Sequence, residues 1–202
     1  MSPSELAELK MKCGTDVESS PVCAKTAAEL ILRSVGEDLE REGLERTPER
    51  FAKALREITG GYAVTLEDAI GQGVFPAEGK GLVAVKKIEF YSMCEHHMLP
   101  FFGTVSAGYY PSEKILGLSK IPRIIEMFSR RFQVQERMTR QIGDAIFSAV
   151  APRAVAVKVT GCHLCMMMRG VRKQDSETTT EYTRGMENLS ADEAARLYMN
   201  LG

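Results

Sequence analysis

Histidine and cysteine, the residue types best suited to metal and acid–base chemistry, gather in two short segments of this chain. The sequence contains only three histidines and five cysteines. His96 and His97 are adjacent and follow Cys94, whereas the third histidine, His163, precedes Cys165 in a second cluster about 65 residues later. Scattered histidines are the expectation for ordinary core or surface roles, so this concentration predicts one composite site.

Thiolate sulfur and neutral imidazole nitrogen are the preferred ligands of zinc. Cys94 and His97 have a Cys-x-x-His spacing that one tight turn can present to a metal, and Cys165 is the best third ligand. Three protein ligands with one open position are typical of catalytic zinc, which lowers the pKa of its water to about 7. His96 and His163 are then available beside the metal to transfer protons, since an unperturbed imidazole has a pKa of about 6.5.

Other interpretations of the same residues stay open at this point. A closed structural zinc site would use Cys94, His97, His163 and Cys165 as four ligands. Cysteine is also often a small buried hydrophobe. Under oxidising conditions Cys94 and Cys165 could pair as a disulfide, although a metal is favoured in a cytosolic chain. The spacing favours a catalytic metal over a structural one.

Composition indicates an ordinary globular protein. The chain has 202 residues, of which 44% are hydrophobic and 26% charged, and its formal net charge is −1. This balance gives no support for a nucleic-acid or anionic-membrane partner. There is no run of about 20 apolar residues and no signal peptide, and the odd cysteine count fits a reducing compartment. We therefore expect a cytoplasmic protein that binds any anionic ligand through a local basic cluster.

The N-terminal part of the chain divides into an arm and a helical region. Residues 1–20 are polar and predict an arm. A helix is expected from Pro21, where apolar residues follow a 3.6-residue period. A second helix is expected from Thr47, because threonine can cap and the proline that follows fits the first helical position. A glycine-punctuated connection over 62–81 then places the end of a 21–80 helical region.

Residues 81–202 carry the pattern of a β-β-α-α-β-β unit. The expected strands cover 82–91, 101–110, 154–160 and 178–182, and the expected helices cover 119–130 and 134–150. The two lysines at 86 and 87 interrupt the alternation of the first strand, which indicates a β-bulge. Ser190 and Glu193 form a capping box for a terminal helix. The order predicts an α+β fold with a four-stranded antiparallel sheet, whose open edges favour side-by-side assembly.

Basic side chains at loop and helix ends are candidates to bind an anionic substrate. Lys120 follows Ser119 at an expected helix start, where backbone N–H groups and the helix dipole add to its charge. Arg123 lies one turn later, and Arg169 follows the second cysteine–histidine segment. The guanidinium fork of arginine binds phosphate bidentately. Each residue alone would be interpreted as a surface charge, but their position beside the motifs favours phosphate binding.

Four linked motifs resemble the GTP cyclohydrolase I family. They are SMCEHHMLPF at 92–101, GLSK at 117–120, QVQERMT at 133–139, and HLCM with RGV at 163–171. They occur in the family's order and spacing, and the likeness runs from about Cys23 to about Thr180. The resemblance implies the tunnelling fold, with two helices on one face of the sheet, and a homodecamer of two stacked pentamers.

The resemblance also implies a reaction. It is the zinc-dependent hydrolytic opening of the imidazole ring of GTP at C8, which releases formate and forms 7,8-dihydroneopterin triphosphate, the first step of tetrahydrofolate and pterin biosynthesis. The implied ligands of zinc are Cys94, His97 and Cys165. In this scheme His163 protonates N7, His96 assists proton transfer, and Ser119 is a candidate proton donor when the ribose rearranges.

Guanine recognition follows from the same resemblance. Guanine presents two parallel donors, the ring N–H and the exocyclic amine, which a single carboxylate accepts in a site that rejects adenine. The resemblance gives this role to Glu136, with Gln135 beside it; without it, Glu136 would be interpreted as an exposed first-turn residue. It also brings Arg50, by itself a solvated charge, to the triphosphate in a neighbouring subunit's site.

Two positions depart from the family pattern. Ser106 stands where the family usually has a histidine, and Thr160 stands where it tends to have a glutamate; the tail after Met186 departs more broadly. A zinc-stabilised binding module without turnover and another tunnelling-fold enzyme, such as a pterin synthase or a deazaguanine reductase, are the alternatives. The Cys-Glu-His-His segment together with Gln135 and Glu136 favours the cyclohydrolase.

Overall fold

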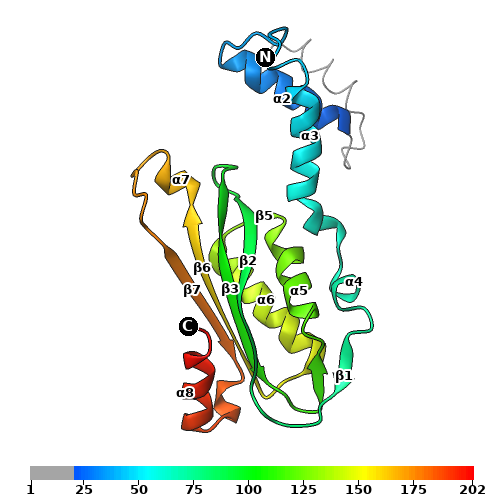
Figure 1. Ribbon diagram of the computed structural model, residues 1–202, viewed down its shortest axis with the longest axis vertical. Helices are drawn as coiled ribbons and strands as arrows, with labels where there is room; N and C mark the ends of the chain where they lie inside the picture. The colour runs from blue at the N-terminus through cyan, green and yellow to red at the C-terminus, as the bar shows by residue number, and fades with distance from the viewer. Residues whose placement is uncertain (1–20) are drawn as a thin grey trace. The chain divides into compact units, whose positions relative to one another are not determined.

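A computed structural model describes residues 21–202 of the chain (Figure 1). The chain divides into two compact units, the first ending at Glu57 and the second covering Ile58–Gly202. The arm expected over 1–20 lies outside the described residues. The boundary expected near residue 80 stays a prediction, because compactness alone does not delimit a catalytic domain.

The first unit contains the two expected helices. They are α2 (Pro21–Ser34) and α3 (Thr47–Ile58), which begin at the residues that the sequence predicts. Gly36 follows α2 with a φ of 84°, and the N–H of Glu37 donates to the carbonyl of Leu32 at 3.1 Å. A glycine in the left-handed region with this hydrogen bond is a common way to end a helix.

The second unit is built on a five-stranded sheet with the order β5-β2-β3-β6-β7. Its four long strands are β2 (Val83–Cys94), β3 (Pro100–Tyr110), β6 (Ala154–His163) and β7 (Thr178–Arg184), each antiparallel to its neighbour. These are the strands that the sequence predicts, with β2 and β6 extended to Cys94 and His163. The fifth strand, β5 (Phe132–Gln133), was not expected; it pairs in parallel with the end of β2.

The expected bulge in the first long strand is confirmed. The register of β2 against β3 shifts between Val85 and Ile88, and Lys87 has a φ of 56°. Pairing resumes with Ile88 opposite Val105 and continues to Met93. The shift sets which side chains of β2 face the helices at the end where Cys94 lies.

Two helices cover one face of the sheet and a third covers part of the other (Figure 1). α5 (Lys120–Ser129) and α6 (Gln135–Val150) pack on the face that buries Phe101, Val105, Ala107, Tyr109, Val155, Val157 and Val159. α8 (Ala191–Met199) places Leu197 against Tyr110 and Ala156, whose side chains alternate to the opposite face. Its predicted capping box is confirmed, because Ser190 and Glu193 bond each other's backbone N–H groups. The fold is therefore α+β, with an antiparallel arrangement of its long strands.

Short elements complete the second unit. They are the 3-10 helices η1 (Gly60–Ala63) and η2 (Met186–Asn188), the helices α4 (Leu66–Ile70) and α7 (Leu164–Met167), and a two-stranded antiparallel sheet of β1 (Val74–Pro76) and β4 (Lys114–Leu116). In the part of the chain that the structure describes, every helix is too short or too polar to span a bilayer.

Candidate metal and nucleotide site

The connection from β2 to β3 is a tight turn that presents Cys94 and His97. The N–H of Cys94 donates to the carbonyl of Leu99 and the N–H of Met98 donates to the carbonyl of Cys94, both at 2.8 Å. Met98 has a φ of 54°. The N–H of Glu95 also donates to the carbonyl of Gln133 at 3.1 Å, so the turn is fastened to β5.

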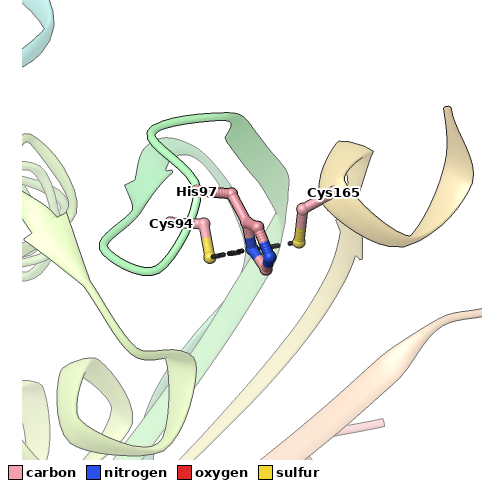
Figure 2. A group of neighbouring side chains, drawn as sticks. All are labelled: Cys94, His97 and Cys165. Atoms are coloured by element: carbon pink, nitrogen blue, oxygen red, sulfur yellow. Dashed lines mark hydrogen bonds between the residues drawn. The ribbon is translucent and has the colours of Figure 1, made fainter. Parts of the chain in front are cut away.

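Sheet pairing brings the second cysteine–histidine segment to this turn. Phe101 at the start of β3 lies opposite His163 at the end of β6, and α7 begins at the next residue. Cys165 in α7 therefore faces Cys94 and His97, as Figure 2 shows. The two Sγ atoms are 3.9 Å apart, Cys94 Sγ is 3.9 Å from Nδ1 of His97, and all ligand atoms lie within 4.8 Å of one another.

These distances fit a metal ion better than the alternatives considered from the sequence. Ligand atoms placed about 2.0–2.3 Å from one ion at tetrahedral angles are roughly 3.3–3.8 Å apart, close to the observed spacing. Cys94 and Cys165 are free thiols rather than a disulfide. Among the described residues the group of possible ligands has three members and does not include His163. A site of three protein ligands is the arrangement that leaves a position open.

The electrostatics of the two thiols also favour a bound cation. Cys94 and Cys165 are 6% and 8% exposed. Burial, together with the proximity of Cys94, raises the pKa of the Cys165 thiol above its ordinary value. Two adjacent buried thiolates are unfavourable without a compensating positive charge, which a coordinated divalent metal supplies.

His163 lies beside this group in a partly buried position. Its ring stacks on Phe101 with centroids 4.5 Å apart and an interplanar angle of 4°, and its Nε2 lies 2.9 Å from Oε1 of Gln135. Burial lowers the pKa of His163 below its ordinary value, although the charge of Glu136 opposes that shift. The neutral imidazole is therefore favoured near pH 7.

A cavity of about 310 Å³ joins the thiol group to the start of α6. Its walls are formed by Cys94, His96, His97, Gln133, Val134, Gln135, Glu136, His163, Cys165, Met166 and Thr178. Glu136 and His96 are exposed, whereas the Gln135 side chain is 2% exposed. Seven of the twelve residues that the sequence suggests for the site line this cavity. An eighth, Arg169, touches it, because its Nη1 lies 3.1 Å from Nε2 of His97.

Ser119, Lys120 and Arg123 lie at the other end of the sheet from the cavity. They begin α5 directly after β4, whose Leu116 N–H donates to the Tyr109 hydroxyl at 2.9 Å. Tyr109 is eight residues along β3 from Phe101, which corresponds to roughly 25 Å of extended strand. Among the described residues of one chain, the cavity walls include none of these three. Arg50 is exposed on α3 and belongs to the first unit.

The departures from the family pattern fall on the sheet face away from the cavity. Ser106 and Thr160 alternate with Val105 and Val159, which pack under the helices. The Ser106 hydroxyl accepts a hydrogen bond from the N–H of Lys87 at 3.4 Å. Neither Ser106 nor Thr160 lines the cavity, so these substitutions leave its walls unchanged.

Several residues around the site were not found from the sequence. Arg137 forms an ion pair with Glu95, whose carboxylate lies 3.9 Å from Nε2 of His96. The stacking of Phe101 on His163 was also missed. The opposite charges of Glu95 and Arg137, each inside one of the four motifs, were an available signal for their ion pair. The contact of Phe101 with His163 depends on the register between two strands, which cannot be deduced from the sequence alone.

By its fold and its site, this α+β chain is a candidate metal-dependent enzyme, with a Cys–His–Cys group at a cavity that two further histidines line. A model of the GTP cyclohydrolase I family matches residues 24–201. The chain belongs to this family and is an enzyme of it, which confirms the resemblance drawn from the four motifs.

Relatives support the assignment over most of the chain. The chain is 51% identical to GTP cyclohydrolase 1 of Deinococcus radiodurans over 184 residues, 91% of this chain and 85% of that protein. It is 53% identical to GTP cyclohydrolase 1 of Methylococcus capsulatus, covering 77% of this chain and 84% of that one. Among solved structures, an archaeosine synthase QueF-Like in the apo form matches at a TM-score of 0.43 and 19% identity, over 54% of this chain and 97% of that chain. That similarity is too low to bear on fold or function.

Proposed function

We propose that this chain catalyses the zinc-dependent hydrolytic opening of the imidazole ring of GTP at C8, with release of formate and formation of 7,8-dihydroneopterin triphosphate. This reaction is the first step of tetrahydrofolate and pterin synthesis. The observation that carries the proposal is the Cys94–His97–Cys165 group at a cavity of about 310 Å³ that also contains His163 and Glu136. The relatives named GTP cyclohydrolase 1 support GTP as the substrate.

The donor set favours zinc as the metal. Two thiolates and one imidazole suit zinc, whereas magnesium and calcium prefer oxygen ligands. Cys94, His97 and Cys165 would hold the ion. The chemistry that zinc supplies in three-ligand sites is activation of water at neutral pH.

Proton transfer in this proposal belongs to the two remaining histidines. His163 protonates N7 of the purine and so makes C8 electrophilic. Because burial lowers its pKa, the protonated imidazole is a stronger acid than an exposed one. His96, which is exposed next to the carboxylate of Glu95, assists proton transfer as the formamide is cleaved.

Recognition of the base falls to Glu136. Its exposed carboxylate lines the cavity at the first turn of α6. One carboxylate accepts both the ring N–H and the exocyclic amine of guanine, and adenine cannot offer this pair of donors. The triphosphate would reach Arg169, which already lies beside His97.

We propose that the remaining phosphate contacts come from a second copy of the chain. Ser119, Lys120 and Arg123 do not line the cavity of their own chain, and the ten-residue helix α5, which they begin, runs about 15 Å towards β5 before the cavity wall is reached. We therefore propose a homo-oligomer in which the Ser119–Arg123 end of one subunit faces the cavity of another, with Ser119 as the proton donor in the ribose rearrangement. Unpaired edges at β5 and β7 suit side-by-side closure into the tunnelling-fold ring, and the family resemblance gives a decamer with Arg50 at the same interfaces.

Two measurements test the proposal. Incubation with GTP followed by oxidation should yield the fluorescence of neopterin, together with one formate per GTP. Metal analysis should find about one zinc per chain, and Cys165→Ser should lose most of it because the site depends on all three ligands. Cys162→Ser is the matched control, since Cys162 lies outside the ligand group. Wild-type zinc content in Cys165→Ser, or no pterin product, would refute the proposal.

A further inference from the structure

The side-chain amide of Gln135, the first residue of α6, has hydrogen-bond partners within the chain at both its nitrogen and its oxygen. Its Nε2 lies 2.8 Å from the carbonyl oxygen of Thr178, 3.2 Å from that of Val159 and 3.2 Å from the Thr180 hydroxyl. Carbonyl oxygens can only accept hydrogen bonds, so the amide nitrogen must face them. The orientation of the Gln135 amide is therefore determined by its surroundings.

The oxygen of the same amide points at His163. Oε1 of Gln135 lies 2.9 Å from Nε2 of His163. An amide oxygen has no hydrogen to donate, so Nε2 of His163 must carry one. A neutral imidazole has a single N–H, which leaves Nδ1 without a hydrogen. The stack on Phe101 at 4.5 Å holds the plane of the ring in this orientation.

The surrounding backbone makes room for this arrangement. A Cβ on Gly161 would lie 2.7 Å from Oε1 of Gln135, so the side chain occupies the space that a larger residue would fill. The Thr139 hydroxyl lies 2.7 Å from the Gln135 carbonyl and 2.6 Å from the Thr180 hydroxyl. Gln135 is thus held from α6, β6 and β7 at once, whereas its neighbour Glu136 is exposed in the cavity.

We propose that Gln135 is a positioning residue: in the resting enzyme it holds His163 as the Nε2–H tautomer with Nδ1 toward the substrate, and it does not contact the guanine base. Nδ1 takes up the proton that His163 then gives to N7, while Nε2–H stays bonded to Gln135. Base recognition then belongs to Glu136 alone. The identity of the substrate rests on the proposed function, but the tautomer of His163 does not, since it follows from hydrogen bonds within the chain.

The tautomer can be measured on the intact wild-type protein without turnover. Solid-state NMR of the zinc-loaded oligomer labelled with [¹⁵N]histidine distinguishes protonated from unprotonated ring nitrogens. His163→Asn identifies the two resonances by their loss. We expect a protonated Nε2 and an unprotonated Nδ1 at His163. A hydrogen on Nδ1 with none on Nε2 would overturn the assignment, whatever reaction the enzyme catalyses.

A pair of neighbouring substitutions separates positioning from base contact. Gln135→Met keeps the length of the side chain but removes the acceptor, so GTP affinity should stay within about threefold of wild type while single-turnover ring opening falls by about 10²-fold. Glu136→Gln, next to it on α6, should instead weaken GTP binding. A loss of GTP affinity in Gln135→Met equal to that in Glu136→Gln, with unchanged ring opening of bound GTP, would overturn the proposal. If Gln135→Met does not fold, the NMR measurement of the His163 tautomer in the wild-type protein tests the proposal by itself.

Discussion

Two inactive variants of this chain should restore each other's activity when their subunits mix. Arg123→Ala removes a cation at the start of α5, and His163→Ala removes the proposed acid at the cavity. Arg123 lies on α5 and does not line the cavity that contains His163. Each variant therefore keeps intact the group that the other lacks, and neither loses one of the three candidate ligand residues.

The size of the recovery follows from counting interfaces. A complete site needs an intact His163 and an intact Ser119–Arg123 segment. In the mixture, the first comes from an Arg123→Ala subunit and the second from a His163→Ala subunit. At an equal ratio and random assembly each is present with a chance of one half, so about a quarter of the sites in a head-to-tail ring are complete. The mixture should reach about a quarter of wild-type turnover, whereas each variant alone should keep about 1% or less.

Neopterin fluorescence after subunit exchange provides the assay, and mass spectrometry of isotope-labelled subunits verifies the exchange. A mixture of Arg123→Ala and Lys120→Ala is the matched control, because both variants lack the same end and every interface stays defective. No recovery in the first mixture after verified exchange would refute a shared site. A monomer that is fully active at the assay concentration, shown by light scattering, would refute it as well.

Other consequences can be measured separately. His163→Ala should keep its metal and bind GTP but lose ring opening by about 10²-fold or more; loss of the metal as well would support a four-ligand structural site. Gly103→Ala should lower the free energy of unfolding by about 2–4 kcal/mol, because a Cβ there would lie 2.0 Å from a backbone carbonyl oxygen of β6; Gly79→Ala, which meets nothing within 4 Å, is the control in urea unfolding, and equal costs would contradict the packing argument. The hydrogen bond from Arg153 lowers the pKa of Glu193 from 4.5 to about 2, so this pair stabilises the fold above pH 4.5 and loses its effect as the pH falls towards 2. Arg153→Met should therefore cost stability near neutral pH and progressively less in acid; a cost independent of pH would exclude the ion pair as its cause.

The sequence was sufficient for the long elements and for the grouping of Cys94, His97 and Cys165. Strands with alternating valines and helices with a 3.6-residue apolar period are set by which side chains are buried, and this pattern can be read directly from the sequence. The three candidate ligands could be grouped because their residue types are rare in this chain. The bulge at Lys87 was also accessible, since two adjacent lysines interrupt an otherwise apolar alternation.

Features that depend on tertiary pairing were not accessible in the same way. β5 has two residues, Phe132 and Gln133, and forms only because the end of β2 lies beside it. The basic residues were assigned to phosphate binding because they lie beside the motifs in the sequence. Helix α5 separates the 117–120 motif from the 133–139 motif, so their distance from the cavity could be estimated only once the elements were placed. The hydrogen-bond partners of the Gln135 side-chain nitrogen lie on β6 and β7. No local sequence pattern on α6 reveals these contacts.

The placement of the cavity and the basic end at opposite ends of the sheet links catalysis to protein concentration. If a complete site exists only between subunits, dilution below the dissociation constant of the oligomer removes activity without unfolding any chain. Nucleotide that bridges two subunits must also strengthen their association by the same factor that association strengthens nucleotide binding. Specific activity should then rise with enzyme concentration at low substrate, and saturating GTP should shift that rise to lower concentrations.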